Sequence, residues 1–345
     1  MIEEKEAKML IPSIEVASLF RGLSAERVVA DKAIHVAATE SGFMTIKGMP
    51  SEAAPTKPMR QQLFRLFTLP DSEKRQLLRR NFDPSRIHLY RGFFPLQNGS
   101  QTYKEGIDMG PDVAHADRRP DPADPLTEST PLPAEEALPG WRAAVRDYYT
   151  GMERLGAAIM RSLARSLELP ETVFEDDFKG GISTLRLIRY PVRPAESLLG
   201  TNPAEVMVDY KGERRAIIGG AHVDSGFVTL LAQDGVEGLQ AKAADGSWVD
   251  VPPVEGSMAV NFGGLLERWT GGRIKATEHR VLGPGRERFS IPFFYEPRVD
   301  VVIRPLPGGP PFAPFTYGDH LWTAMTRFVE FRDLAGMRPP RGVEN

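Results

Sequence analysis

Residues of the kinds that bind metal ions lie at two places in the second half of the chain. His222 and Asp224 stand two positions apart in AHVDSGF, and His279 follows in KATEHRVL. Residues i and i+2 of a strand face the same side, so the first pair is expected to point into one site. Two imidazoles and one carboxylate suit Fe(II) and leave three positions for oxygen and a chelating ligand. The alternative is structural: a hydrogen-bonded histidine with a turn aspartate, and a solvated strand histidine at 279.

A candidate carboxylate receptor follows the second histidine. Arg288 and Ser290 are again i and i+2, in the apolar stretch ERFSIPFF. A guanidinium beside a hydroxyl binds a carboxylate well because the two supply several aligned donors. The alternative is an exposed arginine on an edge strand. The order of the motifs, H-x-D, then His, then R-x-S, is more specific than any one of them and favours a metal site with a carboxylate ligand.

Composition excludes several other kinds of site. The chain has 345 residues, a net charge of −3 and no cysteine. Disulfides, thiolate metal sites, iron–sulfur clusters and cysteine nucleophiles are therefore excluded. The basic residues are scattered, so we expect neither a nucleic-acid nor a membrane partner. The start, MIEEKEAKML, is charged and unlike a signal peptide, and no apolar run is long enough to cross a bilayer, so we expect a cytoplasmic protein.

The first half of the chain predicts mixed α and β structure. Helical spacing, a serine cap and a closing glycine indicate a helix over 24–42, after a short strand and turn at 11–19. A strand is expected at 43–49. Residues 57–78 predict two helices with a break at Pro70, the second capped by Asp71 or Ser72. Residues 115–140 are rich in proline and acidic residues, which is typical of an extended surface segment.

The second half begins with the longest helical pattern, over 140–169, and then changes to a period of two. Short alternating runs separated by turn residues predict strands from residue 182 onward, including one over 272–282 and a hairpin around AADGSW. A C-terminal helix is expected over 319–336. The fold class is therefore mainly β with flanking helices: an antiparallel sandwich or jelly roll, an N-terminal α/β region and a long supporting helix.

The chain resembles the iron(II)/2-oxoglutarate-dependent dioxygenases, in the branch that contains isopenicillin N synthase, plant flavonoid and gibberellin oxidases and their bacterial relatives. The resemblance is carried by the three motifs above and covers nearly the whole chain. Further matching stretches are GLQAKAADGSWVDVPPVEGSMAVNFGGLLERWTGGRIKATEHRV, IPSIEVASL, ESGFMTIKGMP, FTLPDSEKRQL, YRGFF, YKEGIDMGP and LPGWR. It implies a double-stranded β-helix core, with an N-terminal non-haem dioxygenase region at 1–125 and a catalytic region at 126–345 that form one compact unit.

The resemblance also implies an activity. Fe(II) bound by His222, Asp224 and His279, with O₂ and 2-oxoglutarate, would hydroxylate, desaturate or cyclise a small organic substrate and release succinate and CO₂. Arg288 and Ser290 would bind the distal carboxylate of 2-oxoglutarate. An oxidase of the same fold that needs no 2-oxoglutarate, and a non-catalytic jelly roll that binds a ligand or metal, are the alternatives. A monomer or weak dimer is expected.

Other site residues rest on the same resemblance. Tyr190, in LRLIRYP, matches a tyrosine that contacts the co-substrate. Ile188 and Gly264 depart from the family, which often has asparagine at the first position and an acidic residue at the second. Candidates for the substrate pocket are an arginine and four aromatic residues: Arg91, Phe93, Tyr103, Phe262 and Phe294. They would suit a small organic acid or an aromatic metabolite.

Overall fold

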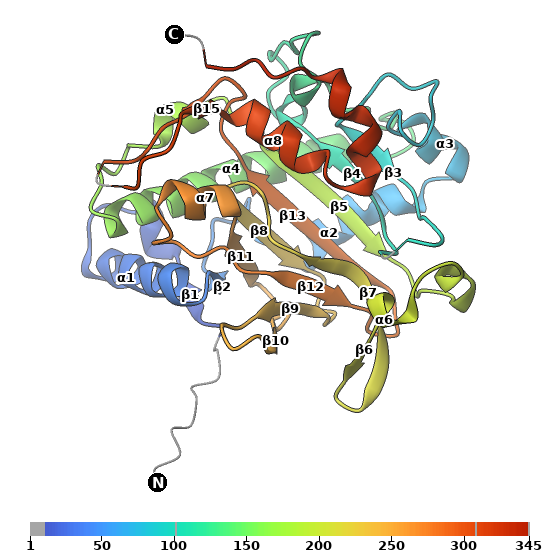
Figure 1. The fold of residues 1–345 in the computed structure, drawn as a ribbon, viewed down its shortest axis with the longest axis horizontal. Coiled ribbons are helices and arrows are strands. Elements are labelled where there is room, and N and C mark those ends of the chain that lie inside the picture. Colours follow the sequence, from blue (N-terminus) through green and yellow to red (C-terminus); the bar gives the residue numbers. More distant parts are fainter. Residues whose placement is uncertain (1–10, 101, 308, 344–345) are drawn as a thin grey trace.

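An eight-stranded sheet forms the larger half of a β-sandwich in the computed structural model, which describes residues 11–100, 102–307 and 309–343 (Figure 1). All pairings in this sheet are antiparallel except that of its first two strands. Its strands in spatial order are β1 (Ser13–Glu15), β2 (Phe43–Lys47), β11 (Met258–Phe262), β8 (Val228–Gln233), β13 (Arg288–Tyr295), β5 (Thr184–Tyr190), β4 (Glu105–Met109) and β3 (Gly92–Phe94). Strands from both expected regions share this sheet, and the boundary at 125 stays a prediction.

A smaller antiparallel sheet packs against the first. Its order is β10 (Trp248–Asp250), β9 (Leu239–Lys242), β12 (His279–Leu282), β7 (Glu213–His222) and β6 (Met207–Tyr210), and a separate pair joins β14 (Val302–Ile303) to β15 (Phe315–Thr316). An apolar cluster joins the facing sheets, with Phe43 and Ile188 from the large sheet and Ile218 and Val281 from the small one. The predicted jelly-roll class is confirmed.

Helices cover the outer face of the large sheet. The helices of the described residues are α1 (Ala25–Glu40), α2 (Lys57–Phe64), α3 (Asp71–Gln76), α4 (Trp141–Ser166), α5 (Glu175–Phe178), α6 (Pro203–Val206), α7 (Gly264–Trp269) and α8 (Tyr317–Met325), with 3₁₀ turns η1 (Ala17–Phe20), η2 (Arg65–Thr68), η3 (Pro111–Val113), η4 (Pro125–Thr127), η5 (Ala195–Leu198) and η6 (Val329–Met337). Helices α1 and α4 contact strands of the large sheet, whereas α6 contacts β6 and β7 of the small sheet. The long helix α4 has buried residues at three- and four-residue spacing. Its Tyr149 packs edge-on against Phe293 of β13, with ring centres 5.0 Å apart.

The pairing register fixes which residues face the small sheet. Residues at partner positions of adjacent strands lie on the same face, so one row runs across Phe43, Asn261, Thr229, Phe294 and Thr184. The ring of Phe43 contacts His279 of the small sheet at 6.0 Å, which identifies this as the inner face. Strand residues two and four positions from the row share that face.

Several predicted elements are confirmed and others need correction. Helix α1 has the predicted Ser24 cap, and α4 begins and ends close to the predicted bounds. The cap of α3 is Pro70 and neither Asp71 nor Ser72, because the Pro70 carbonyl accepts the first hydrogen bonds of the helix. The strand expected over 272–282 covers only its last four residues, since the preceding segment bonds to the end of α1 through Lys275.

The predicted C-terminal helix is two elements. Helix α8 ends at Met325, and the 3₁₀ turn η6 folds back on it. The indole nitrogen of Trp322 donates to the Ala335 carbonyl at 3.0 Å, so the second element packs across the first and does not continue it.

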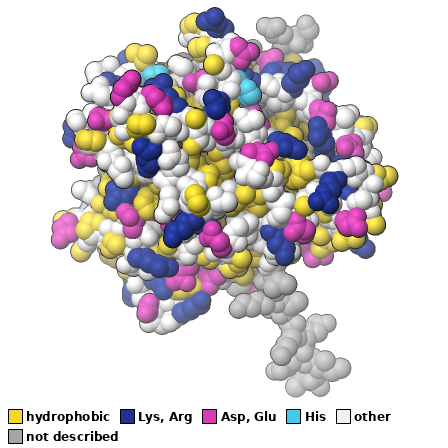
Figure 2. Space-filling model, turned by 180° about the vertical axis from the view of Figure 1, so that it is seen from behind, with side chains coloured by type: hydrophobic (Ala, Val, Ile, Leu, Met, Phe, Trp, Pro, Cys, Tyr) yellow, Lys and Arg dark blue, Asp and Glu magenta, His cyan; other side chains and the backbone are white. Residues whose placement is uncertain are grey.

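Charges of both signs are interspersed on the face shown in Figure 2, without an extended area of one sign. The described residues include no helix with the length and apolar character needed to cross a bilayer. The acidic start of the chain, residues 1–10, lies outside the described residues.

A buried ion pair anchors the C-terminal segment. Arg338 donates from Nε and Nη2 to the two carboxylate oxygens of Asp124, at 2.8 and 3.1 Å, and from Nη1 to Asp319 of α8 at 2.7 Å. Helix α8 in turn contacts the turn after β7, because His320 Nε2 lies 2.9 Å from the Ser225 carbonyl. The ion pair therefore supports, through α8, the turn that carries Asp224.

We expect Asp124→Ala to lower the free energy of unfolding by about 3 kcal/mol, because it leaves a buried guanidinium without its main counter-charge. Urea denaturation measures the change. The control is Asp147→Ala, which removes an exposed pair with Arg146 and should cost less than about 1 kcal/mol. Equal, small effects of both changes would contradict the anchoring role.

Candidate functional site

The three predicted metal ligands meet where the two sheets face one another. One ligand atom from each of His222, Asp224 and His279 lies within 4.8 Å of the others. The Asp224 Oδ1 atom is 3.5 Å from Nε2 of His222 and 3.8 Å from Nε2 of His279. The register pairs the two histidines directly, on β7 and β12.

One detail of the prediction is wrong. Strand β7 ends at His222, so Asp224 lies in the following turn, where the chain crosses from the small sheet to β8 of the large sheet. The Gly264 amide donates to the Asp224 carbonyl at 2.7 Å and holds this turn in place. Val223, between His222 and Asp224, has 40% of its surface exposed.

Hydrogen bonds orient both imidazoles with Nε2 toward the aspartate. Nδ1 of His222 lies 2.7 Å from the Gly220 carbonyl, and Nδ1 of His279 lies 3.1 Å from the Thr277 carbonyl. A carbonyl can only accept, so each Nδ1 carries a hydrogen, and in the neutral imidazole Nε2 then keeps its lone pair for a ligand. Burial lowers the pKa of His279, which favours the neutral form that a metal requires.

Asp224 is held from the large sheet. Its Oδ2 accepts from Thr229 Oγ1 at 2.5 Å and from Asn261 Nδ2 at 2.7 Å, which leaves Oδ1 facing the histidines. Burial by itself would raise the pKa of Asp224, but His279, His222 and the Thr229 hydroxyl together lower it well below its usual range. The donor set is one carboxylate and two imidazoles, and this set fits Fe(II).

A buried arginine with unused donors lies on the same inner face. Arg288 is only 1% exposed, yet its Nε and Nη1 have no hydrogen-bond partner among the described residues, and the same is true of the Ser290 hydroxyl. Its third nitrogen, Nη2, donates to Gln233 Oε1 at 3.3 Å. Buried donors are nearly always bonded, so these atoms indicate a missing acceptor, and a carboxylate group fits them.

Tyr190 and Ile188 complete this part of the inner face. The Arg288 guanidinium lies 5.2 Å from the ring centre of Tyr190, the residue of β5 with which Arg288 pairs. Ile188 pairs with Ser290 and belongs to the apolar cluster between the sheets. At the position where the family often has an asparagine, this chain therefore has the apolar side chain of Ile188 beside Ser290.

The five substrate-pocket candidates lie in different places. Phe294 is on the inner face, next to Thr229. Phe93 and Phe262 stand next to inner-face residues in their strands, so their side chains lie on the opposite, outer face of the large sheet and belong to the apolar core there. Arg91 is fully buried and donates to Thr184 Oγ1 at 2.6 Å. The Tyr103 ring lies 5.7 Å from the Arg193 guanidinium.

Sequence reasoning missed several polar residues of the inner face, above all Thr229, Asn261, Gln233 and Arg186. Thr229, Gln233 and Asn261 are polar residues in mostly apolar strands, and Arg186 is four positions from Tyr190. That spacing places it on the same face and was a usable signal.

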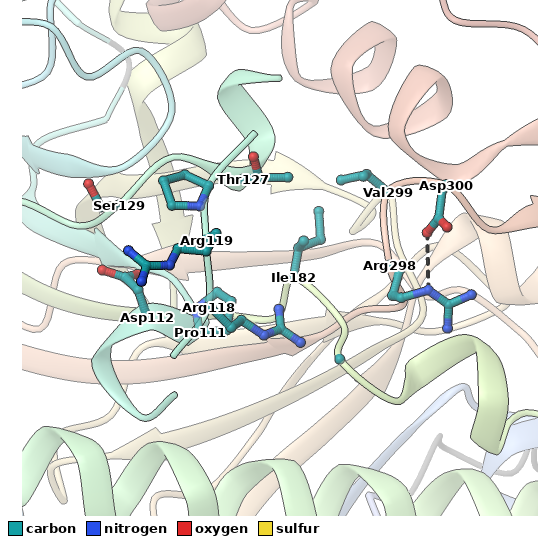
Figure 3. A pocket seen from close by; sticks show the side chains of 12 residues that line it. Pro111, Asp112, Arg118, Arg119, Thr127, Ser129, Ile182, Arg298, Val299 and Asp300 are labelled. Atoms are coloured by element: carbon teal, nitrogen blue, oxygen red, sulfur yellow. Dashed lines mark hydrogen bonds and ion pairs between the residues drawn. The ribbon is translucent and has the colours of Figure 1, made fainter. Parts of the chain in front are cut away.

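A separate surface pocket of about 290 Å³ contains none of these residues (Figure 3). Three arginines line it, but Arg298 bonds to Asp300 and to backbone carbonyls, and Arg118 donates to the Gly181 carbonyl at 2.7 Å. We assign it no ligand.

Two family models match the chain. The model for the 2OG-Fe(II) oxygenase superfamily matches residues 186–297, a range that contains all three metal-ligand candidates and the Arg288–Ser290 pair. The model described as the non-haem dioxygenase in morphine synthesis N-terminal matches residues 11–134.

Individual relatives agree with these matches. A 2-oxoglutarate-Fe(II) type oxidoreductase of Aspergillus fumigatus is 31% identical over 262 residues, which is 69% of this chain and 67% of that protein. Isopenicillin N synthase of Streptomyces clavuligerus is 27% identical over 297 residues, 86% of this chain and 87% of that one. The structure of a full-length Neurospora crassa protein in complex with alpha-KG and 5-formyluracil has a TM-score of 0.76 at 25% identity and covers 94% of this chain and 98% of that one.

We expect Asn261→Ala to weaken divalent metal binding by about 10-fold, because the amide orients Asp224 toward the histidines. Calorimetric titration with Mn(II) measures the change, and Ser257→Ala, just before the same strand, is the control. An unchanged dissociation constant in the Asn261 variant would contradict the orienting role.

Proposed function

The chain belongs to the 2OG-Fe(II) oxygenase superfamily, and on that premise we propose that it hydroxylates a small organic substrate with O₂ and 2-oxoglutarate and releases succinate and CO₂. His222, Asp224 and His279 would hold Fe(II). The observation that carries the proposal is the buried Arg288 with two unused N–H donors beside the unbonded Ser290 hydroxyl. A metal-binding protein without a carboxylate co-substrate has no need for such a receptor.

Fe(II) with bound 2-oxoglutarate would supply the oxidising chemistry, and the protein's own residues supply position and polarity. Arg288 and Ser290 bind the distal carboxylate, and Gln233 holds one guanidinium nitrogen in place. Thr229 and Asn261 fix the Asp224 carboxylate so that one oxygen faces the ion. Burial of Arg288 and Ser290 lowers the local dielectric constant and strengthens their interaction with a carboxylate.

Further properties are part of the same proposal. The substrate is a small molecule, and the interspersed surface charges and the residues that form the site support neither a nucleic acid nor a membrane as partner. A cytoplasmic location and a monomeric or weakly dimeric state remain proposals. Desaturation and ring closure are alternative outcomes at the same site.

The reaction is tested by incubating the Fe(II)-loaded protein with 2-oxoglutarate, O₂ and a library of small organic compounds. We expect succinate formation that depends on both, and its loss in His279→Ala and Asp224→Ala, because each removes a metal ligand. Oxygen uptake without 2-oxoglutarate would indicate an oxidase instead. Absence of succinate across the library would favour a non-catalytic ligand-binding protein.

The carboxylate receptor is tested by Arg288→Gln. We expect 2-oxoglutarate to bind about 10- to 100-fold more weakly to the metal-loaded variant, because charge-assisted hydrogen bonds are lost. The visible charge-transfer band of the anaerobic Fe(II)–2-oxoglutarate complex provides the titration signal. The control Arg286→Gln changes an exposed arginine two positions away, and equal weakening by both changes would contradict the assignment.

A further inference from the structure

Arg186 is a second arginine on the inner face of the large sheet. It lies on β5 two positions after Thr184, which belongs to the row that contains Thr229 and Phe294. Pairing continues outward without a register shift, so Asp108 of β4 lies opposite Arg186 on the same face. The alternation that turns Tyr190 toward the co-substrate receptor therefore turns Arg186 toward the same space.

Arg186 is two strands away from the residue that holds the metal-ligand aspartate. Thr229 lies on β8 and donates to Asp224. Its pairing partner is Phe294 on the neighbouring strand β13, and β5, which carries Arg186, is the strand after that. Strands are spaced about 4.8 Å apart, so the backbone of Arg186 lies about 10 Å from that of β8. A small molecule can span this interval.

The guanidinium is held in place but not fully used. Nε and Nη2 donate to the two Asp108 oxygens, at 2.5 and 2.9 Å, in a fork geometry. The rings of Phe94 and Phe294 lie 5.6 and 5.3 Å from the guanidinium carbon. Nη1 has no hydrogen bond in the described part of the chain, and 25% of the side chain is accessible.

The surroundings favour an anion at this free edge. Among the described residues, the guanidinium of Arg91 donates to neutral acceptors, which are Thr184 Oγ1, the Ile182 carbonyl and the Met109 carbonyl, while its backbone amide donates to the Glu128 carboxylate. Its charge therefore adds to the positive potential near Arg186. Glu296 is a further buried carboxyl of this region, and burial raises its pKa to about 7, so it carries less than a full negative charge near neutral pH.

We propose that the free edge of Arg186 binds a carboxylate of the organic substrate, whose apolar body packs on Phe294 and extends toward the metal site. This inference rests on the proposed function and narrows it to substrates that are themselves organic acids. Arg288 and Arg186 then serve two different carboxylates, one on the co-substrate and one on the substrate. Asp108 holds the Nε and Nη2 atoms of Arg186, so only the Nη1 side of the guanidinium is available to the substrate.

The test uses the full chain loaded with Mn(II) and saturating 2-oxoglutarate, which keeps the complex unreactive. Benzoate, phenylacetate, cinnamate and hexanoate are titrated by calorimetry, each beside its primary amide. We expect the wild type to bind at least one acid about 10- to 100-fold more tightly than its amide, the value of a charge-assisted hydrogen bond. Arg186→Gln should bring this ratio close to one.

Controls separate this inference from the proposed function. Arg189→Gln changes a neighbouring arginine of β5 that faces outward and bonds to Glu105 and Glu287, and it should keep the acid preference. Should Arg186→Gln not fold, Arg186→Lys provides the second measurement, since it keeps the charge but loses the fork and should show a reduced preference. Mn(II) and 2-oxoglutarate binding are titrated first in every variant.

The outcomes are distinct. Failure to bind Mn(II) or 2-oxoglutarate in the wild type refutes the proposed function itself. Normal binding of both, with no preference for acids or no binding by any probe, overturns the role of Arg186. The role is also overturned if Arg186→Gln keeps the preference, or if it weakens 2-oxoglutarate as strongly as Arg288→Gln does.

Discussion

The carboxylate of Asp224 is the point at which the two sheets are tied together chemically. One oxygen accepts hydrogen bonds from Thr229 and Asn261 of the large sheet, and the other faces His222 and His279 of the small sheet. A shift of either sheet would break one half of this arrangement. The position of one sheet relative to the other therefore determines the geometry of His222, Asp224 and His279. The helices that pack on the large sheet contribute to the site by holding that sheet in place.

The inner face is not optimised for the stability of the protein alone. Arg288 and Ser290 keep buried donors without partners, and each such group costs free energy of folding that an apolar residue would not. Natural chains tolerate this where a ligand supplies the missing acceptor. The unbonded donors of Arg288 and Ser290 therefore indicate where an acceptor group of a ligand would bind.

Much of the site was predictable because strand alternation is a strong local rule. It placed Arg288 and Ser290 on one face correctly, and His279, expected on a later strand, lies on β12. It was wrong for Asp224, because the end of a strand depends on where the chain must cross between sheets, which no local pattern encodes. The inner position of Arg186 follows from the same alternation, but its partner Asp108 comes from a distant strand, and only the register reveals the pair.

The order of strands in the large sheet separates two kinds of residue by their distance from its edge. The large-sheet residues proposed to serve the metal and the co-substrate lie on interior strands β8, β11 and β13, whereas Phe94 and Asp108, which contact Arg186, lie on β3 and β4 toward one edge. Strand β3 is an edge strand and among the strands of the sheet pairs only with β4, so Phe94 and Asp108 lie on strands other than those that carry Asn261, Gln233 and Arg288. In the proposed function, substitutions on β3 and β4 would therefore change which acid binds while the residues proposed for the metal and 2-oxoglutarate stay in place. A fold arranged in this way can diversify its substrates while its reaction stays the same.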